Sequence, residues 1–402
     1  MKVELIPGGV TSPRGYRAAA VMAGIKAARN DVALICSAAP AAVAGVFTTN
    51  RIKAAPVKLC QGRVKSGRAQ AIIVNSGNAN ACTGPQGIED ARTTAQLTAQ
   101  ALGMAEDLVL VCSTGTIGVP LPMDKVRPAI PRAAAALSDT GGDAAAKAIM
   151  TTDTVDKQIA ARLKVDGRIV TIGGMAKGAG MIEPNMATLL VFLTTDAAVA
   201  PESLQRALKA AADGSFNRIS VDGDQSTNDT ALLLANGAAG HAPLNEKHPD
   251  WLAFCEALNE VTRALALKIV GDGEGATKLV TVAVRGAASD EDARKAARAV
   301  SNSLLVKTSW FGEDPNWGRV IDAVGYSGAE VTEERVDIRY DDVPAIRGGR
   351  VSGASSFDQL KQVISKKAFT ITIDLNLGAG SHTMYTCDCS YEYVKINGSY
   401  MT

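Results

Sequence analysis

Histidine is scarce in this sequence: only three of the 402 residues are histidine, namely His241, His248 and His382. Serine and cysteine enzymes of the triad type need a histidine beside the nucleophile to take its proton. The first two histidines lie in a polar, proline-containing stretch, GHAPLNEKHPD, which is typical of a loop. We therefore expect that an acyl-transfer site in this chain uses a base other than histidine.

Aromatic residues are also few, at 4% of the chain, and the formal net charge is only +1. Without stacking side chains or a basic surface, binding to nucleic acid is not expected. The start, MKVELIPGGV, has no apolar signal segment, and no later run is long enough for a membrane span. These features favour a cytoplasmic protein that does not bind a membrane.

The seven cysteines are too dispersed to form a recognisable framework. Five of them lie far apart, mostly in apolar surroundings. The remaining pair, Cys387 and Cys389, has no second pair and no nearby histidine that would complete a zinc site. We expect reduced thiols and no metal.

Alanine and glycine are abundant, and short segments of helical and strand character follow one another without a regular βαβ rhythm. The pattern predicts helices at 87–104, 201–213, 249–270, 290–305 and 356–366, and strands at 71–75, 108–112, 188–194, 279–284, 369–377 and 383–394. This mixture favours an α/β fold of the layered α+β kind. The glycine-dense stretch VGDGEGATK separates a large layered α/β sandwich domain, residues 1–275, from a smaller C-terminal α+β domain, residues 276–402.

Two stretches resemble ligand-binding motifs but do not fit them. GDGEGATK lacks the residue spacing of a P-loop. DGDQSTND begins like a calcium loop, but Thr227 stands where glycine is required and Leu233 where glutamate is required. We expect neither a phosphate-binding loop nor a calcium site at these positions.

The stretch GMIEPNMATLLVFLTTDA brings a threonine to the point where a turn meets an apolar, strand-like run. If the peptide bond between Ala187 and Thr188 is cut, Thr188 gains a free α-amine with a pKa of about 7.7–8.0. Threonine with its own α-amine is a known activated nucleophile. The Thr188 hydroxyl can cut that bond itself, by attacking the Ala187 carbonyl and leaving an ester for water to cleave. The alternative is a β-branched residue that only opens a strand.

Two further stretches offer groups that such a nucleophile needs. In VLVCSTGTIGVPLP, a strand is followed by Thr114 and Gly115, whose hydroxyl and backbone N–H can form an oxyanion hole. In GGMAKGAGM, Lys177 lies among glycines and can hold a substrate carboxylate. From these residues alone, an ordinary turn and a solvated lysine stay open as alternatives.

Taken together, the motifs resemble those of the ornithine acetyltransferase (glutamate N-acetyltransferase) family of arginine biosynthesis. The resemblance covers nearly the whole chain, through AGIKAARNDVALI, FTTNRIKAAPV, NSGNANACTG, STGTIG, IMTTDT, GGMAKGAGMIEPNMAT, SVDGDQSTNDT, GDGEGATK, DPNWGR and NGSYMT. It implies autocleavage between Ala187 and Thr188, which gives an α chain, residues 1–187, and a β chain, residues 188–402. It also implies an oxyanion hole at Thr114 and Gly115, and substrate contacts at Thr151, Lys177, Thr188, Glu274, Asn397 and Thr402.

The same resemblance implies a reaction in which an acetyl group passes from N2-acetyl-L-ornithine to L-glutamate through an acetyl-threonine. No metal or organic cofactor is implied. Members of the family differ in their use of acetyl-CoA, so the sequence leaves this second donor open. The expected partners are these small molecules and, within the protein, α and β chains assembled as an α2β2 heterotetramer whose chain terminus returns to the active site.

Two other functions remain compatible with the sequence. An N-terminal-nucleophile aminopeptidase or amidase of related fold would use the same Thr188 chemistry but pass the acyl group to water. A non-catalytic binding or assembly protein would keep the fold and an intact chain. Transfer of the acetyl group to glutamate, rather than to water, would exclude the aminopeptidase or amidase. Cleavage of the chain would exclude the non-catalytic protein.

Overall fold

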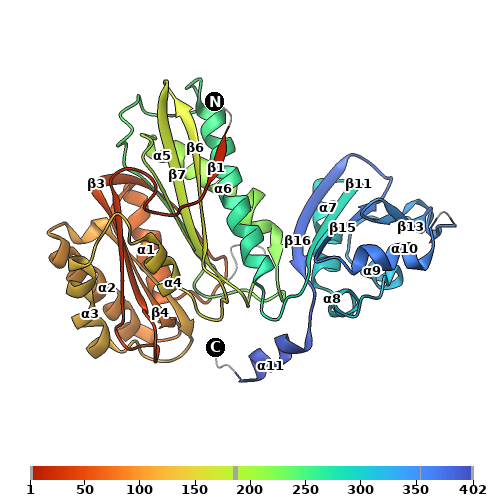
Figure 1. The fold of residues 1–402 in the computed structure, drawn as a ribbon, viewed down its shortest axis with the longest axis horizontal. Helices are drawn as coiled ribbons and strands as arrows, with labels where there is room; N and C mark the ends of the chain where they lie inside the picture. Colours follow the sequence, from red (N-terminus) through yellow and green to blue (C-terminus); the bar gives the residue numbers. More distant parts are fainter. Residues whose placement is uncertain (1–2, 184–188, 354, 400–402) are drawn as a thin grey trace. The chain divides into compact units, whose positions relative to one another are not determined.

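Two compact units make up the part of the chain that the computed structural model describes, residues 3–183, 189–353 and 355–399 (Figure 1). The first unit contains Met1–Asn217 and Asp224–Ile269. The second contains Arg218–Gly223 and Val270–Tyr400. Each unit has a sheet of its own and therefore buries its own core.

A nine-stranded mixed sheet forms the centre of the first unit. In spatial order its strands are β1 (Glu4–Ile6), β6 (Lys157–Val165), β7 (Arg168–Lys177), β8 (Leu190–Thr195), β10 (Thr230–Ala235), β3 (Val32–Phe47), β4 (Arg68–Asn78) and β5 (Val109–Thr116), and β2 (Tyr16–Val21) pairs with β3. Strands β8 and β10 run parallel, and all their residues are buried. Their sequences, LVFLTT and TALLLA, are typical of strands that are covered on both faces.

Helices cover both faces of one half of this sheet. α2 (Gly84–Leu102) and α3 (Met123–Ala135) lie on one side of β4, and α4 (Gly142–Ala148) lies on the other (Figure 1). Alanines such as Ala95 and Ala129 pack against Ile73 and other apolar strand residues. Because these side chains are small, the helices approach the sheet closely and the core stays dense. Three more helices are α1 (Ala55–Arg63), α5 (Pro201–Gly214) and α6 (Trp251–Gly271).

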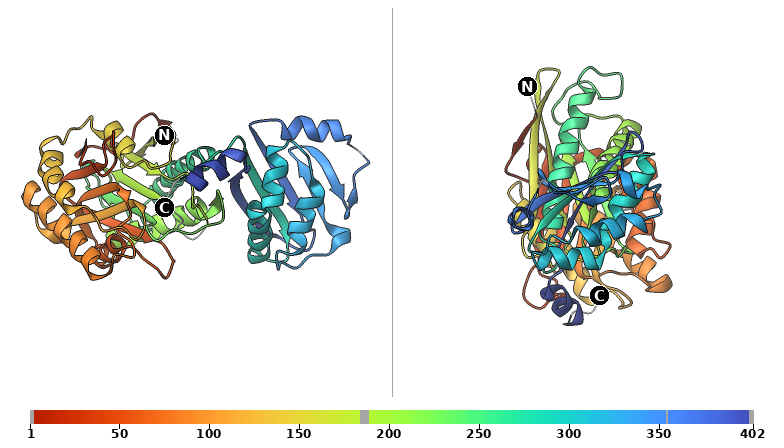
Figure 2. Two further views of the ribbon diagram at one scale, coloured as in Figure 1. Left: turned by 90° about the horizontal axis from the view of Figure 1, so that it is seen from below. Right: turned by 90° about the vertical axis from the view of Figure 1, so that its right-hand side faces the viewer.

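The second unit is built on a seven-stranded sheet. In spatial order its strands are β14 (Arg350–Val351), β13 (Val343–Arg347), β12 (Asp337–Tyr340), β15 (Ala368–Asp374), β11 (Leu279–Ala287), β16 (Gly380–Cys387) and β9 (Ile219–Ser220). Its helices are α7 (Asp290–Asn302), α8 (Leu304–Phe311), α9 (Trp317–Gly325), α10 (Phe357–Ile364) and α11 (Tyr391–Ser399). Two further views show strands and helices in layers within each unit (Figure 2).

The mixed α/β fold class is confirmed, and most predicted elements are found within a few residues of their expected ends. Strand β15 buries Phe369, Ile371 and Ile373 in alternation, as a strand with one face in the core should. Helix α10 begins after Ser356, which forms a capping box with Gln359. Local sequence signals were therefore sufficient for these elements.

The helix predicted at 290–305 was wrong in its extent. It ends at Asn302, and a second helix, α8, begins two residues later. The break lies at Ser303, whose hydroxyl accepts a hydrogen bond from the Val306 N–H at 3.3 Å. A serine at the N-cap position satisfies an N–H group that the start of a helix leaves unpaired, so it favours a new start over continuation.

The strand predicted at 383–394 was also wrong in its extent, because it ends at Cys387 and the chain then forms α11. The hydroxyl of Ser390, just before α11, accepts a hydrogen bond from the Glu392 N–H at 3.2 Å. The alternating residues of YEYVKI had suggested a strand. β-Propensity is a weak and context-dependent signal, and here the serine at the start of the helix outweighs it.

All seven cysteines are free thiols, as the sequence had suggested. Four of them, Cys36, Cys60, Cys112 and Cys387, are buried, whereas Cys82 is exposed. Within the described residues, no helix combines the length and the apolar character needed to cross a bilayer.

Candidate active site

The two predicted oxyanion residues lie at the end of strand β5, next to an irregularity in the sheet. Gly115 pairs with Gly77 of β4, and the register then shifts so that Asn78 pairs with both Thr114 and Thr116. The φ of Gly115 is +135°, which residues with a side chain rarely adopt. A Cβ at Gly115 would lie 2.3 Å from the backbone carbonyl carbon of Gly77. The position therefore requires glycine, as expected where a bulge shapes a site.

Lys177, at the end of β7, links two of the predicted site residues. Its Nζ donates to Thr151 Oγ1 at 2.7 Å and lies 3.4 Å from Thr114 Oγ1, to which it also donates. Lys177 and Thr114 are buried, with exposed fractions of 3% and 5%. Because the ammonium donates to Thr114, the hydroxyl hydrogen of Thr114 can point to another acceptor. The structure thus brings Thr114, Thr151 and Lys177 together.

A buried carboxylate, Asp153, holds Lys177 in this position and was not singled out from the sequence. Its Oδ2 lies 3.9 Å from Lys177 Nζ, and its Oδ1 lies 2.7 Å from Lys157 Nζ. It also accepts hydrogen bonds from the N–H groups of Thr151 and Gly178. Burial alone would raise the pKa of Asp153, but the charges of Lys177 and Lys157 hold it well below its ordinary value. Asp153 is therefore ionised at neutral pH and fixes both the ammonium and the threonine backbone.

A second lysine, Lys26, fixes the segment that leads into the TTDT motif. Its Nζ donates to the backbone oxygens of Ala148 and Met150, both at 3.0 Å. Burial, and then the charge of Arg29, lower the pKa of Lys26 to about 8. The stretch AGIKAARND gives no local sign of this role, because Ala148 lies 122 residues further along the chain.

The predicted nucleophile Thr188 and the residue before it, Ala187, lie outside the described residues. The next residue, Leu189, is described, and its N–H donates to Oδ1 of Asp229 at 2.9 Å. This N–H belongs to the peptide bond that joins Leu189 to Thr188, so the carboxyl group of Asp229 is one peptide unit away from the predicted nucleophile. Asp229 is fully buried.

One side chain ties this junction to the oxyanion residues. Asn228, next to Asp229, donates from Nδ2 to the backbone oxygens of Ala79 at 2.7 Å and Ser113 at 2.8 Å. Ser113 directly precedes Thr114. The start of β8, the start of β10 and the end of β5 are thereby joined by hydrogen bonds. The residues responsible lie in SVDGDQSTNDT, a stretch that contributed to the family resemblance but in which the sequence analysis assigned no role to Asn228 or Asp229.

Two of the remaining predicted substrate residues are found together in the second unit, and the third, Thr402, lies outside the described residues. Asn397 of α11 donates from Nδ2 to Glu274 Oε2 at 2.7 Å and to the backbone oxygen of Tyr393 at 3.0 Å. Glu274 is buried, with an exposed fraction of 8%. The amide thus fixes one oxygen of the Glu274 carboxylate and leaves the other able to accept a hydrogen bond.

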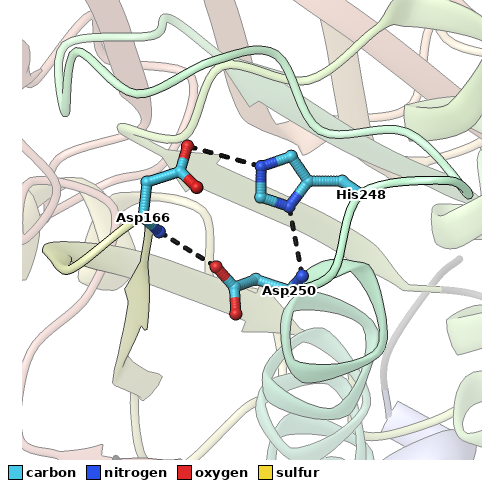
Figure 3. Close-up of side chains that lie close together, drawn as sticks. All are labelled: Asp166, His248 and Asp250. Atoms are coloured by element: carbon cyan, nitrogen blue, oxygen red, sulfur yellow. Dashed lines mark hydrogen bonds and ion pairs between the residues drawn. The ribbon is translucent and has the colours of Figure 1, made fainter.

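One cluster in the described part of the chain brings three potential metal ligands together: Asp166, His248 and Asp250 (Figure 3). His248 Nε2 lies 3.4 Å from Asp166 Oδ2, and His248 Nδ1 accepts from the Asp250 N–H. Asp250 Oδ2 accepts in turn from the Asp166 N–H at 2.9 Å. These hydrogen bonds join the β6–β7 turn to the start of α6 and explain the cluster, so we assign it no metal.

The model of a family described as the ArgJ family matches residues 17–402. The chain is 55% identical to the arginine biosynthesis bifunctional protein ArgJ of Geobacter sulfurreducens, over 97% of this chain and 99% of the relative. It is 54% identical to the protein of the same description from Symbiobacterium thermophilum, over the full length of both. A solved structure of the arginine biosynthesis bifunctional protein argJ from Bacillus halodurans matches with a TM-score of 0.50 and 42% identity, over 52% of this chain and 98% of the solved chain.

Proposed function

The chain belongs to the ArgJ family, and from this premise we propose that it transfers the acetyl group of N2-acetyl-L-ornithine to L-glutamate. The bifunctional description of its relatives supports a second activity, the acetylation of glutamate by acetyl-CoA. The observation that carries the proposal is the contact of Lys177 with Thr114 and Thr151, beside Gly115. In one buried place, a cation suited to a substrate carboxylate meets donors suited to an oxyanion.

The enzyme activates itself by cleavage between Ala187 and Thr188. The Thr188 hydroxyl attacks the Ala187 carbonyl, the acyl group moves from nitrogen to oxygen, and water cleaves the ester. The products are an α chain that ends in the Ala187 carboxylate and a β chain that begins with the Thr188 α-amine. The Bacillus halodurans structure supports a divided chain, because 98% of it covers only 52% of this sequence. A β chain of residues 188–402 makes up just over half of the 402 residues.

In the mature enzyme, the same hydroxyl attacks the acetamide carbonyl of acetylornithine while the Thr188 α-amine takes its proton. The Thr114 hydroxyl and the Gly115 N–H stabilise the oxyanion. As the C–N bond breaks, the α-amine returns the proton to the departing amine of ornithine, which leaves acetyl-Thr188. The amine of glutamate then attacks this ester by the reverse steps. Since one amide is broken and one is formed, the equilibrium lies near unity.

The substrate contacts divide by charge. Lys177 and Thr151 bind the α-carboxylate that acetylornithine and glutamate share. Glu274, whose carboxylate is oriented by Asn397, binds the distal ammonium that only the ornithine substrate carries. Thr402 adds a hydroxyl contact from the chain terminus. We further propose that the enzyme works as a cytoplasmic α2β2 heterotetramer, as its family resemblance implies.

Replacing Lys177 by methionine is expected to weaken the binding of both substrates, because both present an α-carboxylate. Loss of a charge-assisted hydrogen bond costs about 1.5–3 kcal/mol, so KM should rise by roughly 10- to 150-fold for each. Steady-state kinetics with each substrate in turn measures this. The exposed Lys164→Met on β6 is the matched control and should leave both KM values unchanged. An unchanged KM in Lys177→Met would remove Lys177 from the carboxylate site.

Replacing Glu274 by glutamine should separate the two substrates. The expected KM for acetylornithine rises by roughly 10- to 150-fold, since its ammonium loses a charged partner. The KM for glutamate should not rise, because glutamate has no distal ammonium. The exposed Glu291→Gln in the same unit serves as the control. An equal rise for both substrates would contradict this assignment and indicate a general structural effect.

Acetyl transfer itself is tested with acetyl-labelled acetylornithine and glutamate. The proposal predicts labelled N-acetylglutamate in excess over free acetate. Without glutamate, it predicts that separately labelled free ornithine is converted to labelled acetylornithine. Release of acetate alone would identify a hydrolase instead. An intact chain without turnover would identify a non-catalytic protein. Replacing acetylornithine by acetyl-CoA in the same assay tests the second activity.

A further inference from the structure

A buried carboxyl group at the start of strand β10 has only part of its hydrogen-bonding capacity used. Asp229 has an exposed fraction of 0%, and its Oδ1 accepts the Leu189 N–H at 2.9 Å. Within the described part of the chain, its Oδ2 is buried and has no hydrogen-bond partner, because the nearby Thr48 hydroxyl donates to the backbone oxygen of Ser226 at 2.8 Å instead. A buried polar atom without a partner is costly, so it calls for an explanation such as a catalytic role or a bound group.

Backbone contacts on both sides fix where this carboxyl group lies. Strands β8 and β10 are parallel, with Leu190 opposite Thr230, so Asp229 stands opposite Leu189. The Thr230 N–H donates to the Leu189 oxygen, and the Thr48 N–H donates to the Asp229 oxygen. These bonds fix the Asp229 backbone beside the beginning of β8, and the hydrogen bond from the Leu189 N–H orients its carboxyl group. Its unpartnered oxygen stays beside the peptide bond that leads to Thr188.

We propose that Asp229 is the positioning residue for the Thr188 α-amine: its carboxylate fixes the first peptide unit of the β chain and pairs with the α-ammonium that cleavage releases. The inference rests on the proposed cleavage at Thr188. The shift of the acyl group from nitrogen to oxygen breaks the amide bond and frees the Thr188 α-amine. Hydrolysis of the resulting ester consumes one water and yields the Ala187 carboxylate and the Thr188 hydroxyl. A new amine thus arises one peptide unit from Asp229, where the uncut chain had only a neutral amide.

The electrostatics of Asp229 agree with such a change of partner. Burial raises the pKa of the Asp229 carboxyl well above its ordinary value, and the Leu189 N–H, the Thr48 hydroxyl and the charge of Lys177 oppose this only in part. Before cleavage, the raised pKa favours the neutral form of the Asp229 carboxyl group. After cleavage, an ammonium beside it favours the ionised form. Asp229 in turn favours the protonated α-amine and holds it toward the reacting atoms.

The test is the pH profile of acetyl transfer by Asp229→Asn. The α-amine must be neutral to accept the Thr188 proton, so its pKa sets the acidic limb of kcat/KM. Without the carboxylate, this limb should move to lower pH by about one unit, with a fall in kcat. The buried Asp90→Asn of α2 is the control, and it should leave the limb in place. A lower kcat with an unmoved limb would show a merely structural role and overturn the inference.

A second measurement tests the inference if the Asp229→Asn chain does not cleave between Ala187 and Thr188. In the wild-type enzyme, the rate of acetylation of the β-chain N-terminus by acetic anhydride at different pH values gives the pKa of the α-amine. If a carboxylate is its partner, the α-amine should have a pKa at or above the value of about 7.7–8.0 that a free α-amine has. A value clearly below that range overturns the inference. Wild-type chain that stays uncut overturns the proposed cleavage instead, so the two failures are distinguishable.

Discussion

Replacing Thr188 by alanine is expected to give a folded, uncut chain that transfers no acetyl groups. In the proposed mechanism, the same hydroxyl opens the Ala187–Thr188 bond and later carries the acetyl group, so both reactions should be lost together. Folding should survive, because β8 begins at Leu190 and is held by β7 and β10. A denaturing gel reports cleavage, circular dichroism reports folding, and labelled acetylornithine reports transfer.

Serine at the same position provides the matched control. Thr188→Ser keeps the hydroxyl and loses only a methyl group, so the chain should still cleave and should retain part of its transfer activity. A Thr188→Ala chain that splits at this bond would show that another nucleophile makes the cut. An uncut Thr188→Ala chain with normal transfer would show that cleavage is not needed for catalysis.

Replacing Gly115 by alanine is expected to have the next largest effect. The added Cβ would lie 2.3 Å from the Gly77 carbonyl carbon and 2.4 Å from the Asn78 nitrogen, and both are backbone atoms that cannot rotate away. β5 must therefore shift away from β4, which moves the Gly115 N–H and the Thr114 hydroxyl. Loss of one oxyanion donor slows catalysis by roughly 10²–10³-fold, and kcat should fall at least that far.

Gly118→Ala separates this effect from ordinary backbone strain. Gly118 also has a positive φ, +79°, but a Cβ there would meet no atom within 4 Å. It should cost some stability and leave kcat nearly unchanged. Equal losses of kcat in Gly115→Ala and Gly118→Ala would mean that strain in the segment after β5, rather than the oxyanion geometry, limits the reaction.

Thr114, Gly115 and Lys177 could be singled out from the sequence as candidates because their signals are local, and their chemical roles stay predictions. Thr114, Gly115 and Lys177 each stand in a short glycine-containing stretch after or within a strand, and the structure brings Lys177 and Thr114 together. The groups that support them could not be predicted in this way. Asp153 and Lys26 are charged residues, which are normally assigned to the surface. Asp153 is buried and Lys26 is half-buried, and the contacts of Lys26 depend on partners that lie far along the chain, such as Ala148.

The fold shows the same limit in strand β3, Val32–Phe47, which the sequence did not predict. Pro40 interrupts its apolar pattern, and proline within a central strand argues against a strand. In the structure the register with β4 shifts between Cys36 and Ala41, and the residues between Ser37 and Ala41 are exposed. The proline is tolerated because it lies in this irregularity, where it donates no ladder hydrogen bond.

The most direct test of the central claim is the mass of the chains after a brief reaction with acetylornithine in the absence of glutamate. The account predicts two chains, 1–187 and 188–402, with one acetyl group on the second, located at the Thr188 side chain by fragmentation. Addition of glutamate should remove that acetyl group and produce N-acetylglutamate. An acetyl group on any other residue, or a single uncut chain that is fully active, would contradict the account.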